Sequence, residues 1–85
     1  MVATYKEYNM KLKYITYDNG LLDTILIFPV LVQHRDFVVP GKILGAGFID
    51  INDGIWNCYG ESISLNVKSR LEDTKIANRT LNFKE

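Results

Sequence analysis

The chain has 85 residues, of which 47% are apolar and 24% charged. This composition is typical of one folded domain and excludes a disordered segment or a repeat array. Ten Lys and Arg residues balance ten Asp and Glu residues, so the strong basic field of nucleic-acid-binding domains is absent and we expect no nucleic-acid partner. The single cysteine excludes an internal disulfide, and small secreted domains usually contain several, so we expect a cytoplasmic location.

We expect neither a signal peptide nor a membrane span. No apolar segment follows a basic start in residues 1–9, as a signal peptide would require. The longest uncharged stretch, residues 24–33, is too short to cross a bilayer and contains Pro29. Because Met10-Lys11-Leu12 resembles a natural start, we divide the chain into an N-terminal extension, residues 1–9, and a single domain, residues 10–85. The extension either lies outside the minimal fold or lengthens the first strand.

Two β-hairpins are predicted by turn chemistry between β-rich segments. Residues 11–18 and 22–28 are rich in β-branched and aromatic side chains and flank Asn19-Gly20. Residues 42–51 and 55–61 flank Asp53-Gly54 in the same way. Asn-Gly and Asp-Gly suit the positive φ angles of a two-residue type I′ turn, which reverses the chain between two paired strands.

Between the hairpins, and after the second one, the pattern changes. Pro29 fits the first turn of a helix, Pro40 ends it, and apolar residues between them recur at helical spacing, so we expect a short helix over residues 30–39. Residues 62–67 alternate polar with apolar side chains, which predicts a fifth strand.

A C-terminal helix is predicted to begin after Ser69. Ser69-Arg70-Leu71-Glu72 matches the capping box, in which the Ser hydroxyl and the Glu carboxylate each accept an unpaired backbone N–H. The adjacent carboxylates Glu72 and Asp73 would stabilise the positive end of the helix dipole. Four residues should face the sheet: Leu71, Thr74, Ala77 and Leu81.

These elements predict an α+β domain. We expect an antiparallel sheet of four to five strands built from the two hairpins, with the short middle helix and the C-terminal helix packed on one face. The expected core residues are Ile25, Ile27, Phe37, Phe48, Trp56, Leu65 and Leu71.

The residues that could carry chemistry are few. Catalysis by Cys58 would need a nearby base, and His34 lies on a different predicted element. A free cysteine that alternates with Trp56 along a strand is ordinarily buried and inert. One His and one Cys cannot supply the three or four protein ligands of zinc. We therefore expect no catalytic residue, no metal and no cofactor.

The second half of the chain resembles small uncharacterised proteins of bacteria and their tailed phages. The resemblance rests on Ala46-Gly47-Phe48, on residues 58–65 and on residues 69–73. It implies a bacterial or prophage setting and brings no activity with it. Within these segments Arg70 comes within reach of a carboxylate such as Glu61 or Glu72. Glu61, Ser62 and Arg70 are thus either a turn closed by an ion pair or a candidate polar cluster.

The function expected from these features is a non-enzymatic protein–protein interaction domain that self-associates, with a homodimer as the simplest form. A chain this short buries a small core, and its zero net charge removes repulsion between copies. The candidate interface residues are Ile63, Leu65 and Val67 on a poorly charged edge strand, and Ile76 and Phe83 on the outer face of the C-terminal helix. Two alternatives remain: a phage or prophage effector that binds and blocks a host enzyme, and a small enzyme that uses Cys58 or His34.

Overall fold

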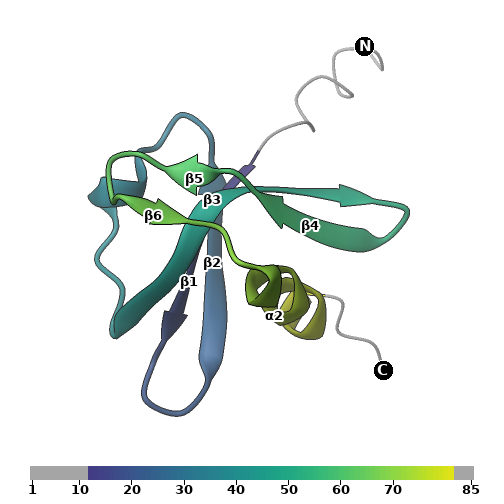
Figure 1. The fold of residues 1–85 in the computed structure, drawn as a ribbon, viewed down its shortest axis with the longest axis horizontal. Helices are drawn as coiled ribbons and strands as arrows, with labels where there is room; N and C mark the ends of the chain where they lie inside the picture. Colours follow the sequence, from purple (N-terminus) through teal and green to yellow (C-terminus); the bar gives the residue numbers. More distant parts are fainter. Residues whose placement is uncertain (1–11, 82–85) are drawn as a thin grey trace.

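The computed structural model describes residues 12–81 (Figure 1). Four strands form the main sheet: β1 (Leu12–Asp18), β2 (Asp23–Pro29), β3 (Lys42–Asn52) and β4 (Ile55–Tyr59). They lie in the order β2-β1-β3-β4, and all neighbours are antiparallel. The α+β class and the antiparallel sheet are therefore confirmed. The expected extension, residues 1–9, lies outside the described residues.

Both predicted hairpins form, and one has the turn that the sequence indicates. Asp53 and Gly54 have φ angles of 54° and 81°, which fits a two-residue type I′ turn. In the first hairpin the Asn19 N–H donates to the Leu22 carbonyl, so the two-residue loop is Gly20-Leu21, one position later than expected. Only Gly20 has a positive φ there, 98°, and the Leu21 and Leu22 N–H groups donate to the side-chain oxygen of Asn19.

The expected helix over residues 30–39 is wrong except for one turn, the 3₁₀ helix η1 (His34–Asp36). The Val32 N–H donates to the Pro29 carbonyl at 3.1 Å, so the chain turns directly after β2. After η1 it is extended again, with φ −108° and ψ 135° at Phe37. Packing explains the difference, because an extended path lets Val32, Phe37 and Val39 all reach the sheet.

The expected fifth strand over residues 62–67 is also wrong. Two-residue strands, β5 (Glu61–Ser62) and β6 (Val67–Lys68), pair with each other, and a turn separates them. The Ser62 hydroxyl accepts the Leu65 N–H at 3.2 Å, and Asn66 has a φ of 58°. A serine side chain that bonds nearby backbone competes with strand pairing, which explains why the alternating pattern did not become a long strand.

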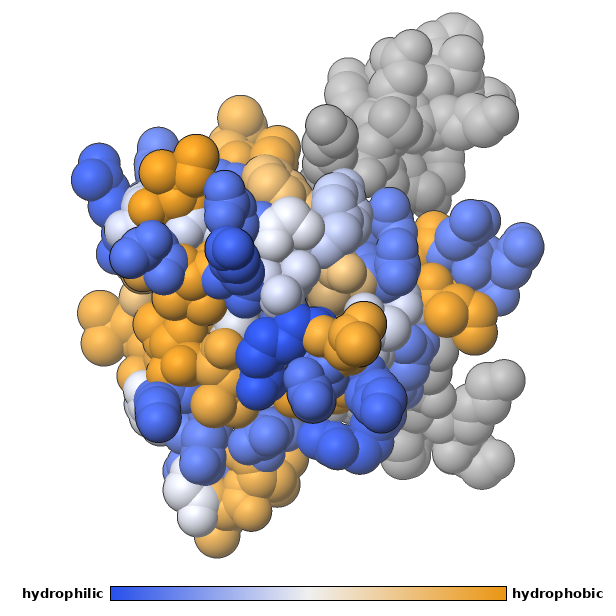
Figure 2. Space-filling model, in the orientation of Figure 1, coloured by the Kyte–Doolittle hydropathy of each residue, from blue (hydrophilic) through white to orange (hydrophobic). Residues whose placement is uncertain are grey.

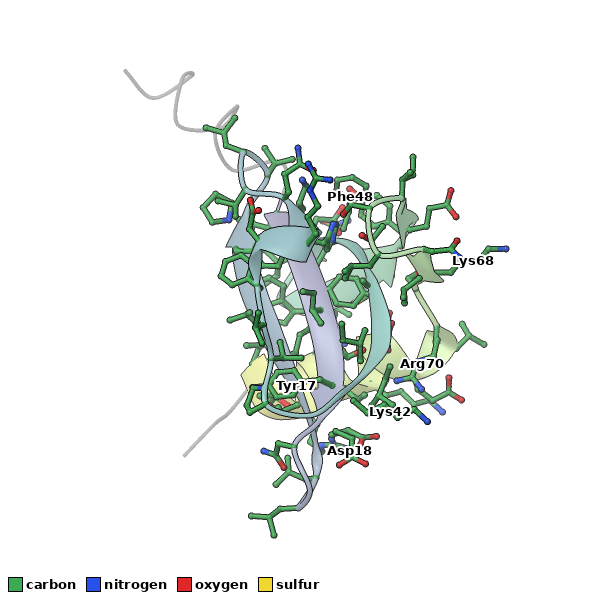
Figure 3. All side chains as sticks on the ribbon, turned by 90° about the vertical axis from the view of Figure 1, so that its left-hand side faces the viewer. Tyr17, Asp18, Lys42, Phe48, Lys68 and Arg70 are labelled. Atoms are coloured by element: carbon green, nitrogen blue, oxygen red, sulfur yellow. The ribbon has the colours of Figure 1, made fainter. Side chains whose placement is uncertain are left out.

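The sheet is buried on both faces. On its helix face Tyr14, Ile49 and Ala77 form one cluster, which α2 (Leu71–Leu81) covers. On the opposite face, called here the loop face, Ile15, Phe28 and Ala46 form a second cluster beneath η1, its flanking loops and the β5–β6 hairpin. Phe48 lies at one end of the loop face and Tyr17 at the other (Figure 3). The helical elements therefore lie on opposite faces, because each face needs its own cover.

The expected core residues are placed accordingly. Ile25, Ile27 and Trp56 pack around the helix-face cluster, and Phe37 and Leu65 around the loop-face cluster. Phe48 stacks on Tyr59 on the loop face. Leu71 is the exception, since 85% of its surface is exposed.

The exposure of Leu71 follows from where α2 begins. The helix starts at Leu71, so its N-cap is Arg70 and not Ser69. Asp73, not Glu72, accepts the N-cap N–H, at 2.9 Å from the Arg70 nitrogen. This one-residue shift turns the helix so that Asp73, Ile76 and Ala77 face the sheet. The expected outward position of Ile76 is thus wrong.

Candidate functional site

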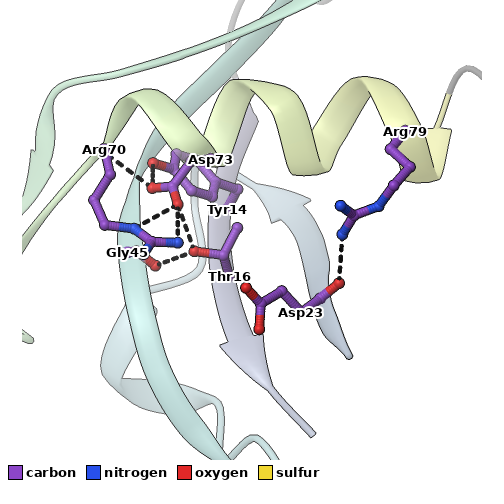
Figure 4. Close-up of polar contacts among 7 residues, drawn as sticks. All are labelled: Tyr14, Thr16, Asp23, Gly45, Arg70, Asp73 and Arg79. Atoms are coloured by element: carbon purple, nitrogen blue, oxygen red, sulfur yellow. Dashed lines mark hydrogen bonds and ion pairs between the residues drawn. The ribbon is translucent and has the colours of Figure 1, made fainter. Parts of the chain in front are cut away.

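The most concentrated polar chemistry of the described chain is the carboxylate of Asp73, which is 0% exposed (Figure 4). Its Oδ2 accepts the Tyr14 hydroxyl at 2.5 Å, and its Oδ1 accepts the Thr16 hydroxyl at 2.9 Å. Tyr14 and Thr16 alternate along β1 and so point to the same face. A central strand therefore presents two hydroxyl donors to one helix side chain.

Arg70 supplies the charge that makes this burial tolerable. Its Nε donates to Asp73 Oδ1 at 3.0 Å, and its NH2 group lies 2.8 Å from the same oxygen. A buried carboxylate is costly unless it is both paired and hydrogen-bonded, and here it is both. The Tyr14 pKa is raised far above its ordinary value, first by burial and then by the hydrogen bond to Asp73.

Gly45 provides the space for this carboxylate. A Cβ at this position of β3 would overlap the Asp73 side chain, so only glycine lets the helix approach the strand here. Both oxygens of Asp73 are occupied by donors of the fold. The cluster therefore anchors α2 to the sheet and offers no carboxylate oxygen to a substrate.

A cavity of about 530 Å³ lies beside the start of α2, and Cys58 and Thr74 line it. The Thr74 hydroxyl accepts the Cys58 N–H at 3.1 Å, and the Arg70 guanidinium in the same wall is paired with Asp73. Burial, and secondarily the negative charge of Asp73, raise the pKa of the Cys58 thiol to about 12. A thiol with this pKa is protonated at neutral pH and is a poor nucleophile.

A second cavity, of about 370 Å³, lies on the loop face and includes His34 and Lys13 in its wall. His34 is buried, and its Nε2 lies 2.9 Å from the Gly47 carbonyl. The Lys13 ammonium donates to the Val32 carbonyl at 2.8 Å. Burial lowers the pKa of His34, and the Lys13 charge adds to this effect. These groups support the loops that cover the sheet.

Cys58 and His34 lie on opposite faces of the sheet. Cys58 packs against the helix-face cluster, whereas the His34 ring meets Phe28 and Phe48 edge-on on the loop face. A thiol and a base separated by a sheet cannot exchange a proton directly. The structure therefore does not bring these two residues together.

The two edges of the main sheet differ, and this is the feature that matters most for binding. At the β4 edge, Asn78 of α2 accepts the Trp56 N–H and donates to the Trp56 carbonyl, both at 2.9 Å. Thr74 takes the Cys58 N–H, as described above. A helix that occupies the outward groups of an edge strand blocks pairing with another chain.

The β2 edge has no such cover among residues 12–81. The hydrogen bond between Asn19 and Leu22 fixes which residues of β2 face β1, because facing direction alternates along a strand. Asp23, Ile25, Ile27 and Pro29 consequently turn their backbone groups outward. Arg79 donates to the Asp23 carbonyl at 3.0 Å, and Val32 to that of Pro29. The described chain provides no partner for the outward N–H and C=O groups of Ile25 and Ile27.

Exposed apolar residues flank this edge at both ends. Leu21 and Leu22 form the tip of the β1–β2 hairpin, the orange region at the bottom of Figure 2. Val30 and Leu31 follow the other end of β2. Leu21 is 90% exposed and Leu31 92%. An open strand edge between exposed apolar side chains is the described surface best suited to another strand.

The predicted interface residues do not form one surface. Ile63 is 86% exposed in the β5–β6 turn, as an interface would need. Leu65 and Val67 are half-buried and pack on the loop-face cluster. Ile76 is buried against the sheet, and Phe83 lies outside the described residues.

The predicted polar cluster is likewise divided. Glu61 and Ser62 belong to the wall of the loop-face cavity, whereas Arg70 lines the cavity beside α2 and binds Asp73. Ser62 is buried and its hydroxyl holds the β5–β6 turn. The ion pair that the sequence suggested for Arg70 exists, but its carboxylate is Asp73 and not Glu61 or Glu72.

Sequence reasoning missed Asp73 and the β2 edge. Asp73 lies three residues before Ile76 and four before Ala77, so it shares their helix face; that spacing could have revealed a carboxylate on a buried face. For the β2 edge no local signal existed, because the order of strands in a sheet is not written in any one strand.

Comparisons with family models, with curated proteins and with solved structures return no match. Within residues 12–81, no group of three or more His, Cys, Asp or Glu side chains could hold a metal ion. In the same part of the chain, no helix has the length and apolar character needed to cross a membrane.

The role of Asp73 can be tested by Asp73→Asn. This change removes the charge that pairs with Arg70 and replaces an acceptor with a donor, so the free energy of unfolding should fall by about 3 kcal/mol. Urea unfolding followed by circular dichroism measures it. Glu72→Gln, one residue away and exposed, is the matched control and should change stability by less than about 0.5 kcal/mol. Equal effects of the two changes would remove Asp73 from its anchoring role.

The state of Cys58 can be tested with a maleimide at pH 7.5. Because only the thiolate reacts and the pKa is raised to about 12, the folded protein should react on the order of 100-fold more slowly than the urea-unfolded chain. Mass spectrometry follows the labelled fraction over time. Equal labelling rates of the folded and unfolded protein would contradict the raised pKa, and Cys58 would again be a candidate nucleophile.

Proposed function

We propose that the protein is a non-enzymatic protein–protein interaction domain that self-associates, and that the edge of β2 is its contact surface. In this mode a strand of one chain extends the sheet of another through backbone hydrogen bonds. Neighbouring side chains then add apolar contact. The proposal includes a cytoplasmic location, where the single cysteine stays reduced.

The difference between the two sheet edges carries this proposal. The helix α2 occupies both outward groups of Trp56 and the outward N–H of Cys58 at β4. No comparable cover meets the outward groups of Ile25 and Ile27 within residues 12–81. Proteins usually protect exposed strand edges with charges, prolines or covering elements. Residues 24–28 of β2 are uncharged, and exposed apolar side chains lie beyond both ends of the strand, which suits a strand-pairing surface.

Two alternatives are less well supported. An enzyme using Cys58 or His34 would have its nucleophile and base on opposite faces of the sheet, with the thiol protonated. An effector that blocks a host enzyme would use the same β2 edge on a foreign strand. The bacterial or prophage setting implied by the resemblance is compatible with both binding functions and does not choose between them.

Ile25→Pro tests the β2 edge. The Ile25 N–H points away from β1, so proline removes an outward donor without removing a hydrogen bond inside the sheet. Sedimentation equilibrium should show self-association of the wild-type protein below about 100 μM, which corresponds to a contact of roughly −6 kcal/mol. The dissociation constant of the variant should rise at least about tenfold, because each copy loses a hydrogen bond and gains a steric block.

Val38→Pro is the control for introducing a proline at an exposed position outside the β2 edge. Val38 is 96% exposed in a loop away from β2 and follows an extended residue, Phe37, which proline tolerates. Its dissociation constant should stay within about twofold of the wild type. A wild-type protein that remains monomeric at about 100 μM contradicts self-association. Equal weakening by both prolines contradicts the assignment to the β2 edge.

A further inference from the structure

The β2 edge is self-complementary in one register, and we infer that two copies pair there as a closed two-fold dimer centred on Leu26. This inference rests on the proposed function and adds the partner, its direction and the stoichiometry. The two β2 strands run antiparallel and join both main sheets into one. The two-fold axis runs perpendicular to that sheet, so both copies of α2 cover the same face.

The register follows from which outward groups are already occupied. The Asp23 carbonyl accepts a hydrogen bond from Arg79. Pro29 has no N–H, and its carbonyl accepts a hydrogen bond from Val32. Among the described residues 12–81, Ile25 and Ile27 are the residues of the β2 edge whose outward N–H and C=O groups are both unoccupied. When Leu26 faces the partner's Leu26, Ile25 faces the partner's Ile27, and every N–H and C=O of these two residues finds a partner.

Neighbouring registers leave groups unused. Centring the axis on Ile25 sets Ile27 against the partner's Asp23, whose carbonyl already binds Arg79. Centring it on Ile27 sets Ile25 against the partner's Pro29, which has no N–H to donate. Only the register centred on Leu26 pairs every outward N–H and C=O group of Ile25 and Ile27.

The same register brings the apolar ends of the edge together. Antiparallel pairing about Leu26 places the Leu21-Leu22 turn of one copy beside the partner's Val30-Leu31 turn, at both ends of the contact. These are four of the exposed large apolar residues of the described chain. A parallel arrangement would place each turn beside its own copy instead. The contact is thus apolar at its ends and backbone-bonded at its centre.

The dimer is closed because pairing uses the one edge of the main sheet that α2 leaves open among residues 12–81. The β2 edge of each copy is paired with that of the other. At β4, side chains of α2 accept the outward N–H groups of Trp56 and Cys58. An isologous contact of this kind adds no further copy. Association should therefore stop at two chains.

Introducing charged side chains at the exposed ends of the β2 edge tests the direction of pairing without changing the core. Leu21 and Leu31 lie at opposite ends of the seven-residue β2, roughly 20 Å apart within one chain, so their charges interact mainly across the dimer. We compare the double variant Leu21→Lys with Leu31→Glu against the double variant Leu21→Lys with Leu31→Lys. Antiparallel pairing sets opposite charges together in the first and like charges together in the second.

In about 50 mM salt, where the Debye screening length is about 14 Å, the first double variant should dimerise about tenfold more tightly than the second. The difference should shrink at about 1 M salt, where screening is strong. Sedimentation equilibrium gives both the dissociation constants and the largest species. Circular dichroism confirms that each variant is folded, as expected for side chains that are about nine-tenths exposed.

The outcomes separate this inference from the proposed function. Equal dissociation constants for the two double variants, with a wild-type dimer that Ile25→Pro weakens, would overturn the antiparallel register and keep the edge, because parallel pairing sets like charges together in both variants. Tighter dimers of the second variant would equally contradict this register. Species larger than two chains would overturn closure. A wild-type monomer at every concentration would overturn the proposed function and this inference with it.

Discussion

The buried carboxylate of Asp73 fixes the position of α2, and the exposed surface of the protein depends on that position. It joins β1 through Tyr14 and Thr16, closes the N-terminus of the helix through Arg70, and fits against β3 only because residue 45 is glycine. Burying a charged side chain in a small core has a large desolvation free energy. The carboxylate is also a specific anchor, because no other residue of α2 could make the same set of bonds at this place.

The position of α2 decides which edge of the sheet is covered. Held at Asp73, the helix runs along the side of β4, where Thr74 and Asn78 reach the outward backbone groups of Cys58 and Trp56. Further along, Arg79 reaches only the first residue of β2. One helix thus covers one edge and leaves most of the other open, and the proposed interaction surface is the consequence of where the anchor lies.

The sequence predicted the features that short stretches of chain determine. Asp53-Gly54 and Asn19-Gly20 marked both hairpins, since positive φ angles are a local property. It failed where tertiary contacts decide. The segment after Pro29 became extended because Val32 and Phe37 reach the sheet that way, and Ser62 turned its own chain instead of joining a strand.

The candidate site was less predictable than the fold for the same reason. The capping pattern at Ser69 placed a helix start within one residue, but the true cap depends on Asp73, whose partners are more than 50 residues away in sequence. Of the interface residues chosen from the alternation in residues 62–67, Leu65 and Val67 are half-buried by packing on the loop face, and Ile63 is exposed. The openness of β2 depends on strand order, which no local pattern expresses.

Amide hydrogen exchange, followed by NMR as a function of protein concentration, tests the central claim most directly. The Trp56 and Cys58 amides should be protected at every concentration, because Asn78 and Thr74 accept their N–H groups. The Ile25 and Ile27 amides should exchange rapidly in dilute protein and become protected as the concentration rises and β2 edges pair. Protection of Ile25 and Ile27 that does not depend on concentration would contradict the open edge, and rapid exchange at Trp56 and Cys58 would contradict the cover that Asp73 sets in place.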